Sequence, residues 1–529
     1  MKILALNLSH HASCAIVENG KIELFIEESR LSKIKYHQDI NKILKTLKKN
    51  YFDYISYTHS NLQGRELKIQ NLILESLKEH EITYGQIIVF PFHHQTHSFS
   101  AFYNSGFKKA ICLIVDNGGL NIYDDRINYG NEILSIIKID KKIEDVFKIC
   151  SNLNGETIKK DNKLFSLPTI SLGGMYNFFL NAFDLKEPGA VMGLSCYGKE
   201  DKDSLLKPFF FEDNLFFSNP TFLYRAVEDK KEKLTNYCFK LQKQTTEIIL
   251  NYIDYIKNKF PEYPICLSGG VFQNCMINFE IIKKHKNIFV DPVCHDGGTS
   301  LGLAQHLYFL ITNKKPLSYE NIYLGLNYNY SDLVKHLLSN KSFDNLFFRK
   351  TSSEEVADLL SNNNVVALFQ GRSESGPRAL GNRSILFNPS NIHGKEIVNL
   401  IKKRKWFRPY AGTVLNEFKK DWFNFYNKEN TEYMTYAVEV KKEKQNLIPA
   451  ITHVDGTCRV QTLTEEHNVN FYNLIKNFYK ITGIPVLLNT SLNLAGKPLV
   501  EDLDDLIEIL KETEIKYGYL PEYDLLIFK

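Results

Sequence analysis

The stretch from residue 370 to 384 holds the densest set of ligand-binding side chains in the sequence. Three arginines alternate there with three glycines: Arg372, Arg378 and Arg383 with Gly371, Gly376 and Gly381. Glycine leaves the backbone open to a ligand, and a guanidinium binds phosphate or carboxylate through paired N–H donors. Such closely spaced cations repel one another unless an anion lies among them. The glycine spacing favours a small polyphosphate over a nucleic-acid backbone or a solvated surface.

Further polar residues extend this candidate phosphate site along the chain. Lys402 and Arg408 follow in the next block, Arg459 comes later, and Asn489 ends a buried, strand-like run. Ligand groups of α/β sheets sit at such strand ends. We therefore expect these four residues, together with the three loop arginines, to bind a phosphorylated ligand.

A second set of residues has the composition of a metal site. His93 and His97 are four residues apart, so a helix would place both imidazoles on one face. Asp116 and Asp296 each follow an apolar run and precede glycines. The four side chains would suit a divalent first-row ion with open positions for substrate oxygens. Two alternatives stay open: the aspartate loops cradle phosphate, or they are ordinary Asp–Gly turns.

A third candidate is the turn Ser268-Gly269-Gly270, which lies between an apolar run and a helical pattern. Paired glycines at a helix N-terminus let backbone amides approach an anion closely. The turn lacks the Gly-Lys-Ser/Thr ending of a P-loop. We expect it to contact a phosphate group.

These residues need strands and helices to hold them. The apolar pattern predicts strands at 3–8, 22–26, 86–90 and 110–115, with a hairpin turn at 18–21 and a helix between the last two strands. A helix is expected at 233–260, and strand–loop–helix units at 263–284 and 288–310. Residues 119–167 are polar and weakly patterned, and we interpret them as a hairpin-bearing insertion. Alternating strands and helices indicate an α/β fold.

The C-terminal part shows its own series of elements. Composition changes near 312–316, and an apparent linker runs on toward residue 346. Beyond it we expect strands at 365–369, 435–440 and 484–489, and helices near Ile397 and at 469–482. A chain of 529 residues exceeds one hydrophobic core. The expected domains are residues 1–330 and 345–529.

Composition excludes several classes of protein. The 65 basic and 61 acidic residues nearly balance, which gives no overall footprint for binding nucleic acid or anionic lipid. Nine scattered cysteines without a C-x-x-C pair indicate a reduced, intracellular protein. No apolar run reaches membrane-spanning length, so we expect no membrane partner and a cytoplasmic location.

Taken together, the motifs closely resemble the O-carbamoyltransferases of antibiotic and nodulation-factor biosynthesis. The resemblance spans nearly the whole chain, and the order of its short motifs makes it specific. They are His10-x-Ala-Ser, Glu28-x-Arg-Leu-Ser-Lys-Ile-Lys35, the His93/His97 pair, Met192-Gly-Leu-Ser-Cys-Tyr-Gly198, Ser268-Gly-Gly, Asp296-Gly-Gly, residues 371–384, Phe407-Arg-Pro-Tyr-Ala411, His453-Val-Asp-Gly-Thr and Asn489-Thr-Ser.

The resemblance implies a fold and a division of labour. The N-terminal part would be an actin-like ATPase-type domain of two RNase H-like halves, with His93, His97, Asp116 and Asp296 holding iron (Fe²⁺). The C-terminal part would be a YrdC-like twisted-sheet domain that makes carbamoyl-adenylate from carbamoyl phosphate and ATP with Mg²⁺. Around these substrates the family's cationic positions match Arg378, Lys402, Arg408 and Arg459. The positions near the transferred carbamoyl group match His10 and Lys35.

The implied activity is ATP-dependent carbamoyl transfer to an acceptor hydroxyl. A natural product or a sugar would be the usual acceptor, and 5-hydroxymethylcytosine in hydroxymethylated DNA is a sharper alternative. The resemblance leaves room for a homodimer. The chain departs from the family's pattern at His11, where an aspartate is usual, and at Ala190, where a lysine is common. Acceptor recognition is therefore expected to differ from that of well-known members.

Two other functions compete with this interpretation. A tRNA threonylcarbamoyl-transfer enzyme would share the N-terminal fold, but the arginine-rich C-terminal half speaks against it. A non-catalytic, actin-like nucleotide-binding module would leave the arginine loop without a role. The choice of general base for the acceptor, His10 or a metal-bound group, stays open.

Overall fold

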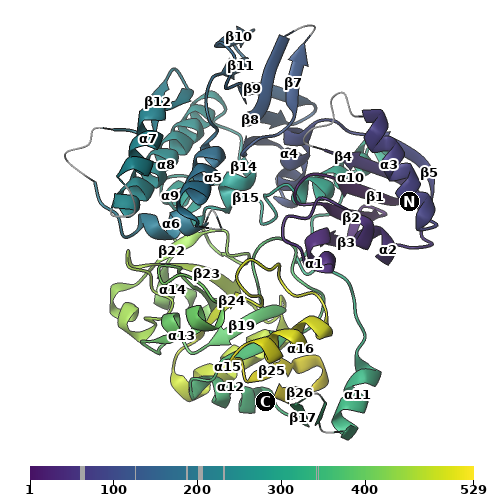
Figure 1. The fold of residues 1–529 in the computed structure, drawn as a ribbon, viewed down its shortest axis with the longest axis vertical. Coiled ribbons are helices and arrows are strands. Elements are labelled where there is room, and N and C mark those ends of the chain that lie inside the picture. Colours follow the sequence, from purple (N-terminus) through teal and green to yellow (C-terminus); the bar gives the residue numbers. More distant parts are fainter. Residues whose placement is uncertain are drawn as a thin grey trace. The chain divides into compact units, whose positions relative to one another are not determined.

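The computed structural model describes residues 1–59, 66–124, 127–185, 187, 189–200, 206–229, 233–340, 342–343 and 345–529. These residues form two compact units, shown in Figure 1. The N-terminal unit comprises Met1–Ser32 and Tyr36–Glu320, and the C-terminal unit comprises Lys33–Lys35 and Asn321–Lys529. The division falls at Glu320, inside the expected linker and before the expected end of the first domain at residue 330. Residues just beyond it hydrogen-bond within the C-terminal unit, because the Ser375 amide donates to the Ile322 carbonyl.

The first half of the N-terminal unit is built on a sheet in the order β3-β2-β1-β4-β5. Its strands are β1 (Lys2–Asn7), β2 (Ser13–Glu18), β3 (Lys21–Glu27), β4 (Tyr51–Thr58) and β5 (Thr83–Val89). The helices are α1 (Glu28–Ser32), α2 (Asn41–Thr46), α3 (Glu66–Glu79) and α4 (His93–Asn104). The first three strands are antiparallel, and β4 and β5 run parallel to β1. Strand β1 is buried almost throughout, as expected of a strand covered on both faces.

The second half repeats this arrangement. Its strands are β6 (Ala110–Val115), β7 (Asn121–Asp124), β8 (Ile127–Ile139), β9 (Ile143–Ser151), β10 (Ile158–Lys160), β11 (Leu164–Leu167), β14 (Ile265–Ser268) and β15 (Ile288–Val290). The core order β9-β8-β6-β14-β15 matches that of the first sheet, with β6 in the place of β1. Strands β14 and β15 run parallel to β6, as β4 and β5 do to β1. The duplication confirms the expected pair of RNase H-like halves.

This repeat corrects our interpretation of residues 119–167 as an insertion. Strand β8 pairs with β6 along the whole of β6, and β9 pairs with β8. Both strands therefore belong to the central sheet. The sequence pattern did not predict these two central strands, because β8 and β9 carry polar residues between their buried positions. They lack the continuous apolar run of β6.

Helices cover both sheets of the N-terminal unit. In the second half they are α5 (Leu172–Phe183), α6 (Gly189–Ser195), α7 (Pro220–Glu228), α8 (Leu234–Lys259), α9 (Cys275–Lys284) and α10 (Gly298–Thr312), beside the hairpin β12 (Phe209–Glu212) and β13 (Leu215–Ser218). Helix α4 packs against β6 and β14 of the second sheet, and α10 packs against β1, β2 and β4 of the first. The expected helix at 233–260 is confirmed by α8.

Helices α4 and α10 also pack against each other, between the two sheets. Gly302 makes the close approach feasible, because a Cβ at this position would lie 2.1 Å from the carbonyl oxygen of Thr96. This contact brings α4, which carries both candidate histidines, next to the residues that precede α10.

The C-terminal unit contains one long sheet in the order β16-β17-β26-β25-β18-β19-β24-β20-β23-β22-β21. Its strands are β16 (Ser342–Phe343), β17 (Leu346–Lys350), β18 (Val366–Phe369), β19 (Arg383–Phe387), β20 (Ala411–Leu415), β21 (Phe423–Asn424), β22 (Ala437–Val440), β23 (Thr457–Leu463), β24 (Val486–Ser491), β25 (Tyr517–Leu520) and β26 (Leu525–Phe528). The helices are α11 (Ser331–Asn340), α12 (Ser353–Ser361), α13 (Gly394–Ile401), α14 (Lys419–Trp422), α15 (Val469–Thr482) and α16 (Leu503–Glu512). The predicted helix at 469–482 matches α15. Most neighbouring strands of this sheet are antiparallel, so the unit is a mixed α/β unit built on one sheet, in keeping with the expected sheet domain.

In the part of the chain that the structure describes, no helix is long and apolar enough to cross a membrane.

Candidate active site

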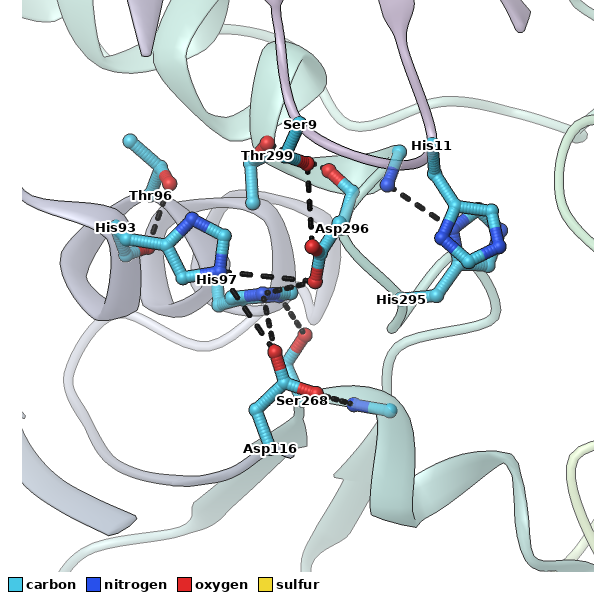
Figure 2. A network of polar contacts seen from close by, with 12 residues as sticks. Ser9, His11, His93, Thr96, His97, Asp116, Ser268, His295, Asp296 and Thr299 are labelled. Carbon is cyan, nitrogen blue, oxygen red and sulfur yellow. Dashed lines mark hydrogen bonds and ion pairs between the residues drawn. The ribbon is translucent and has the colours of Figure 1, made fainter. Parts of the chain in front are cut away.

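Four buried side chains meet inside the N-terminal unit. His93, His97, Asp116 and Asp296 each offer one ligand atom, and these atoms lie within 4.8 Å of one another. Figure 2 shows the two imidazoles and the two carboxylates pointing toward a common centre. The Nε2 atoms of the histidines lie 3.6–3.8 Å from the nearest carboxylate oxygens. The structure thus brings together all four residues that the sequence suggested as metal ligands.

Local structure explains why these residues meet. One helical turn of α4 places His93 and His97 on the same face. Asp116 directly follows strand β6, and Asp296 precedes α10 by two residues. The contact between α4 and α10 then joins the two histidines to Asp296.

The electrostatics of the cluster favour a cation. Within the described residues, His97 Nε2 and both ring nitrogens of His93 are buried without a hydrogen-bond partner, a costly arrangement unless a ligand is bound. Burial lowers the pKa of His93, but Asp296 and Asp116 outweigh it and raise the pKa to about 10. Burial opposes the charged form of Asp296, yet the imidazoles hold its pKa well below the usual range. Two carboxylates and two ring nitrogens therefore fit a divalent metal ion.

His10 lies at the edge of this cluster. Its Nδ1 is 3.4 Å from Asp296 Oδ2, and about half of its side chain is exposed. Partial burial lowers the pKa of His10, but the hydrogen bond and charge of Asp296 raise it above the ordinary value. His10 can therefore contact both a metal ligand and a substrate in solution.

Beside it, His11 is half-buried, and this burial lowers its pKa to about 3. Its ring centroid is 4.7 Å from that of His295, whose Nε2 lies 3.4 Å from Glu27. His11 is therefore neutral and packs against its neighbours. It does not supply the negative charge of the aspartate that is usual at this position.

The turn Ser268-Gly269-Gly270 adjoins the cluster. The Gly270 amide donates to Asp116 Oδ1 at 3.1 Å, and Ser268 Oγ lies 3.4 Å from His97 Nδ1. Gly269 has φ +97°, and a Cβ there would lie 2.3 Å from the Val115 carbonyl oxygen. The paired glycines thus bring a backbone amide to the Asp116 carboxylate. The expected contact of this turn with a phosphate group stays a prediction.

In the C-terminal unit, strand register brings two predicted phosphate-binding residues, Arg459 and Asn489, into one row. Asn489 of β24 pairs with Ala411 of β20, and Ala411 pairs with Arg459 of β23. Side chains in register lie on the same face of a sheet. The amide of Asn489 donates to the Ala379 carbonyl at 3.3 Å, which ties the partly exposed Arg378 to this row. Arg408, also partly exposed, precedes β20.

Other cations predicted to bind phosphate have a different position. Arg383 is fully buried, stacks on Phe369 at 3.9 Å, and donates to the carbonyls of Gln370, Gly371, Asn382 and Glu501. Arg372 donates to the carbonyls of Leu324 and Gly325. These guanidiniums hold the loop together because they donate hydrogen bonds to backbone oxygens.

Two lysines also lie where the sequence did not suggest. Lys402 is buried, and its ammonium donates to the Ser491 and Asn493 carbonyls and to the Asn493 side chain. Lys402 therefore anchors the turn after β24. Lys35, predicted to lie near the transferred group, is part of the C-terminal unit.

Sequence reasoning missed several contributors. Ser9 donates to Asp296 Oδ2 at 3.1 Å, and Asp291 accepts from Ser268 Oγ at 3.4 Å. Glu374 shapes the arginine loop by accepting the amides of Leu380, Asn382 and Arg383. Asp291 had a signal, since it follows an apolar strand as Asp116 does. Ser9 and Glu374 had none beyond adjacency to the motifs.

Fold and site define a class of protein: a two-unit α/β protein with a metal-type cluster in a duplicated actin-like unit and a cationic sheet face in the other. Comparison with known families is more specific. The carbamoyltransferase N-terminus matches residues 43–305, and the carbamoyltransferase C-terminus matches residues 357–526. The chain belongs to the carbamoyltransferase family and is a carbamoyl-transferring enzyme.

The chain is similar to several known proteins along much of its length. An uncharacterised protein of Methanocaldococcus jannaschii is 30% identical over 98% of this chain and 99% of its own. Nodulation protein NolNO of Sinorhizobium fredii is 27% identical over 96% of this chain and 77% of its own. The 3'-hydroxymethylcephem-O-carbamoyltransferase of Amycolatopsis lactamdurans is 30% identical over 61% of this chain and 62% of its own. A crystal structure of full-length HypF in the phosphate- and nucleotide-bound form aligns with 60% of this chain and 56% of that chain, at 16% identity and TM-score 0.39.

Proposed function

We propose that the chain is an ATP-dependent O-carbamoyltransferase that takes its carbamoyl group from carbamoyl phosphate. Carbamoyl phosphate would lose phosphate to water and give carbamate, whose oxygen attacks the α-phosphorus of ATP and releases pyrophosphate. The acceptor oxygen would then attack the carbamoyl carbon of carbamoyl-adenylate, and AMP leaves. The balance is one carbamate ester, AMP, pyrophosphate and phosphate from carbamoyl phosphate, ATP, water and the acceptor.

The observation that carries the proposal is the presence of two chemically distinct sites in two units. In the C-terminal unit, proposed to be YrdC-like, Arg459 lies in the Asn489 row. Arg378 precedes Ala379, whose carbonyl accepts from Asn489, and Arg408 precedes β20. Guanidiniums at these positions would stabilise charge that develops on phosphate oxygens during adenylation. Arg372, Arg383 and Lys402 would support that surface from within.

The N-terminal unit would perform the transfer. We propose Fe²⁺ as its resident metal, held by His93, His97, Asp116 and Asp296, with Mg²⁺ accompanying ATP as substrate. When bound, the ion would supply a Lewis acid toward substrate oxygens. His10, bonded to Asp296 on one side and exposed on the other, would hold the proton of the acceptor hydroxyl. Lys35 keeps its proposed role near the carbamoyl group.

The test is a product assay with the full-length protein, carbamoyl phosphate, ATP and a panel of hydroxyl acceptors. AMP and pyrophosphate should appear only when both substrates are present. Absence of AMP with every acceptor would contradict the proposal. Arg378→Ala should reduce AMP release about 10²–10³-fold, which the non-catalytic alternative does not predict.

The acceptor defines the biological role. We propose a hydroxyl of a natural product or sugar, in keeping with the relative that acts on a hydroxymethylcephem. Hydroxymethylated DNA is the second acceptor to test. Label transferred from carbamoyl phosphate to DNA containing 5-hydroxymethylcytosine, with none on plain cytosine DNA, would identify it.

A further inference from the structure

Each carboxylate of the metal-type cluster uses its two oxygens differently. Asp116 Oδ2 faces the histidines at 3.7 and 3.8 Å, while its Oδ1 accepts the Gly270 amide at 3.1 Å. Asp296 Oδ1 faces both histidines at 3.6 Å. Its Oδ2 instead accepts from the Ser9 hydroxyl at 3.1 Å and lies 3.4 Å from His10. One oxygen of each aspartate therefore points to the centre, and the other is held from outside.

One histidine is held in the same way. His97 Nε2 faces the carboxylates, and His97 Nδ1 lies 3.4 Å from Ser268 Oγ. The Ser268 hydroxyl donates to Asp291 Oδ2 at 3.4 Å, so its lone pair is left for the imidazole. A hydroxyl has one proton, and Ser268 can then only accept from His97 Nδ1–H. This tautomer leaves the Nε2 lone pair directed at the centre.

We propose that Ser9 and Ser268 are positioning residues of the metal centre. With the Gly270 amide, they restrict Asp116 and Asp296 to one ligand oxygen each and fix His97 as an Nε2 ligand. The ion then has two nitrogen and two oxygen donors from the chain, and its other coordination positions stay open to substrate oxygens. The inference rests on the proposed function, since it takes the four-residue cluster to be a metal centre.

The location of the two serines supports this role. Ser9 lies just beyond β1 and Ser268 ends β14, so the two sheets each supply one outer hydroxyl. Both side chains are buried, at 4% and 0% exposure, and neither needs a solvent contact to satisfy its donor. Each contacts, in a ligand side chain, the polar atom that is turned away from the centre. This is the usual place of an outer partner that orients a metal ligand.

The experiment is a Co²⁺ titration of the full-length, chelator-treated protein, followed by the visible absorption of bound Co²⁺. Ser9→Ala and Ser268→Ala should each weaken Co²⁺ binding about 10–100-fold and alter the absorption spectrum. Ser9→Thr should restore most of the affinity, because it keeps the hydroxyl. Circular dichroism and thermal unfolding report whether each variant is folded. If Ser268→Ala does not fold, the comparison of Ser9→Ala with Ser9→Thr tests the inference.

Ser300→Ala is the matched control. Its equally buried hydroxyl, in the first turn of α10, donates to the Gly297 carbonyl at 3.1 Å and contacts Ser13. Affinity should stay within about twofold of wild type, as expected of a group that contacts no ligand. An equal loss in Ser300→Ala and Ser9→Ala, or unchanged affinity in both proposed variants, would overturn the inference.

The outcome can be separated from that of the proposed function. If the wild-type protein binds no Co²⁺, the metal centre and the inference fail together. AMP release from ATP and carbamoyl phosphate is measured independently and tests the carbamoyl-transfer proposal. A protein that binds Co²⁺ with serine-dependent affinity but releases no AMP supports the inference and contradicts the proposed function.

Discussion

Gly269 occupies a backbone conformation that side chains rarely adopt, between two groups that contact the metal-type cluster. Its φ is +97°, and an added Cβ would lie 2.3 Å from the Val115 carbonyl oxygen. Gly269→Ala should lower the free energy of unfolding by about 3–4 kcal/mol, from strain and from the displaced backbone. It should also weaken Co²⁺ binding, because Ser268 and Gly270 must shift together. Urea unfolding and Co²⁺ titration measure the two effects.

Gly106 provides the control for this substitution in the same unit. It also has a positive φ, +76°, but no heavy atom lies within 4 Å of the added Cβ. Gly106→Ala should cost only about 1–2 kcal/mol and leave Co²⁺ affinity unchanged. Equal effects of the two substitutions would show that the close approach of Gly269 to Val115 has no role.

At the residue scale, the sequence could identify types of ligand but not their surroundings. The spacing of His93 and His97 and the carboxylates after strands predicted the cluster. Arg378 and Arg383 look alike in sequence, yet one is partly exposed and the other is buried among carbonyls. That difference depends on Glu501, more than a hundred residues away, and no local pattern carries it.

At the scale of elements, Glu374 determines the shape of the arginine loop. Its Oε1 accepts the amides of Leu380, Asn382 and Arg383, which would otherwise be buried donors. Glu374→Ala should destabilise the C-terminal unit by about 3–5 kcal/mol and raise the KM for ATP. Glu374→Gln, which keeps one acceptor oxygen, should cost roughly half as much. Denaturant unfolding and initial rates test both effects. As a control, Glu396→Ala at an exposed position should lower the free energy of unfolding by less than about 1 kcal/mol.

Helix α2 supplies a prediction about pH. Glu28 is fully buried and accepts the amides of Lys42 and Ile43 at the start of this helix. Burial outweighs these donors and raises the pKa of Glu28 to about 7 from 4.5. The folded state then holds a proton that the unfolded chain releases, so this contribution to stability falls as pH rises from 4.5 to 7.

Glu28→Gln removes the titrating group and with it this dependence. Relative to the variant, the wild-type protein should lose about 2–3 kcal/mol of unfolding free energy between pH 4.5 and 7. Urea unfolding of both proteins across that range gives the difference, and titrating groups that do not contact Glu28 cancel. Parallel pH profiles of the two proteins would contradict the raised pKa.

The elements also show where sequence patterns succeed. Buried parallel strands such as β6 and β14 are continuous apolar runs, and the long helix α8 has a clear helical period. Strands β8, β19, β20 and β23 were missed or misplaced. Arg383 and Arg459 lie inside β19 and β23 because their partners in the sheet come from distant segments. Tertiary pairing, which the local sequence does not encode, decided these elements.

At the scale of the whole molecule, the metal-type cluster lies in the duplicated unit, and the row of Arg459 and Asn489 lies in the sheet unit. The residues of the metal-type cluster lie on α4, directly after β6 and just before α10. All of them belong to the unit Met1–Ser32 and Tyr36–Glu320. The row of Arg459 and Asn489 lies entirely within Asn321–Lys529. Two half-reactions, adenylation and transfer, should therefore be lost separately in full-length variants.

Labelled pyrophosphate exchanging into ATP in the presence of carbamoyl phosphate measures adenylation alone. Arg378→Ala should reduce this exchange about 10²–10³-fold, because a charge that stabilises the reacting phosphates is lost, while Co²⁺ binding stays intact. Asp296→Asn should show the reverse: exchange near the wild-type rate, no bound Co²⁺ and no carbamoylated acceptor. If Asp296→Asn abolished exchange as well, adenylation would need the N-terminal cluster, and the assignment of one half-reaction to each unit would be wrong.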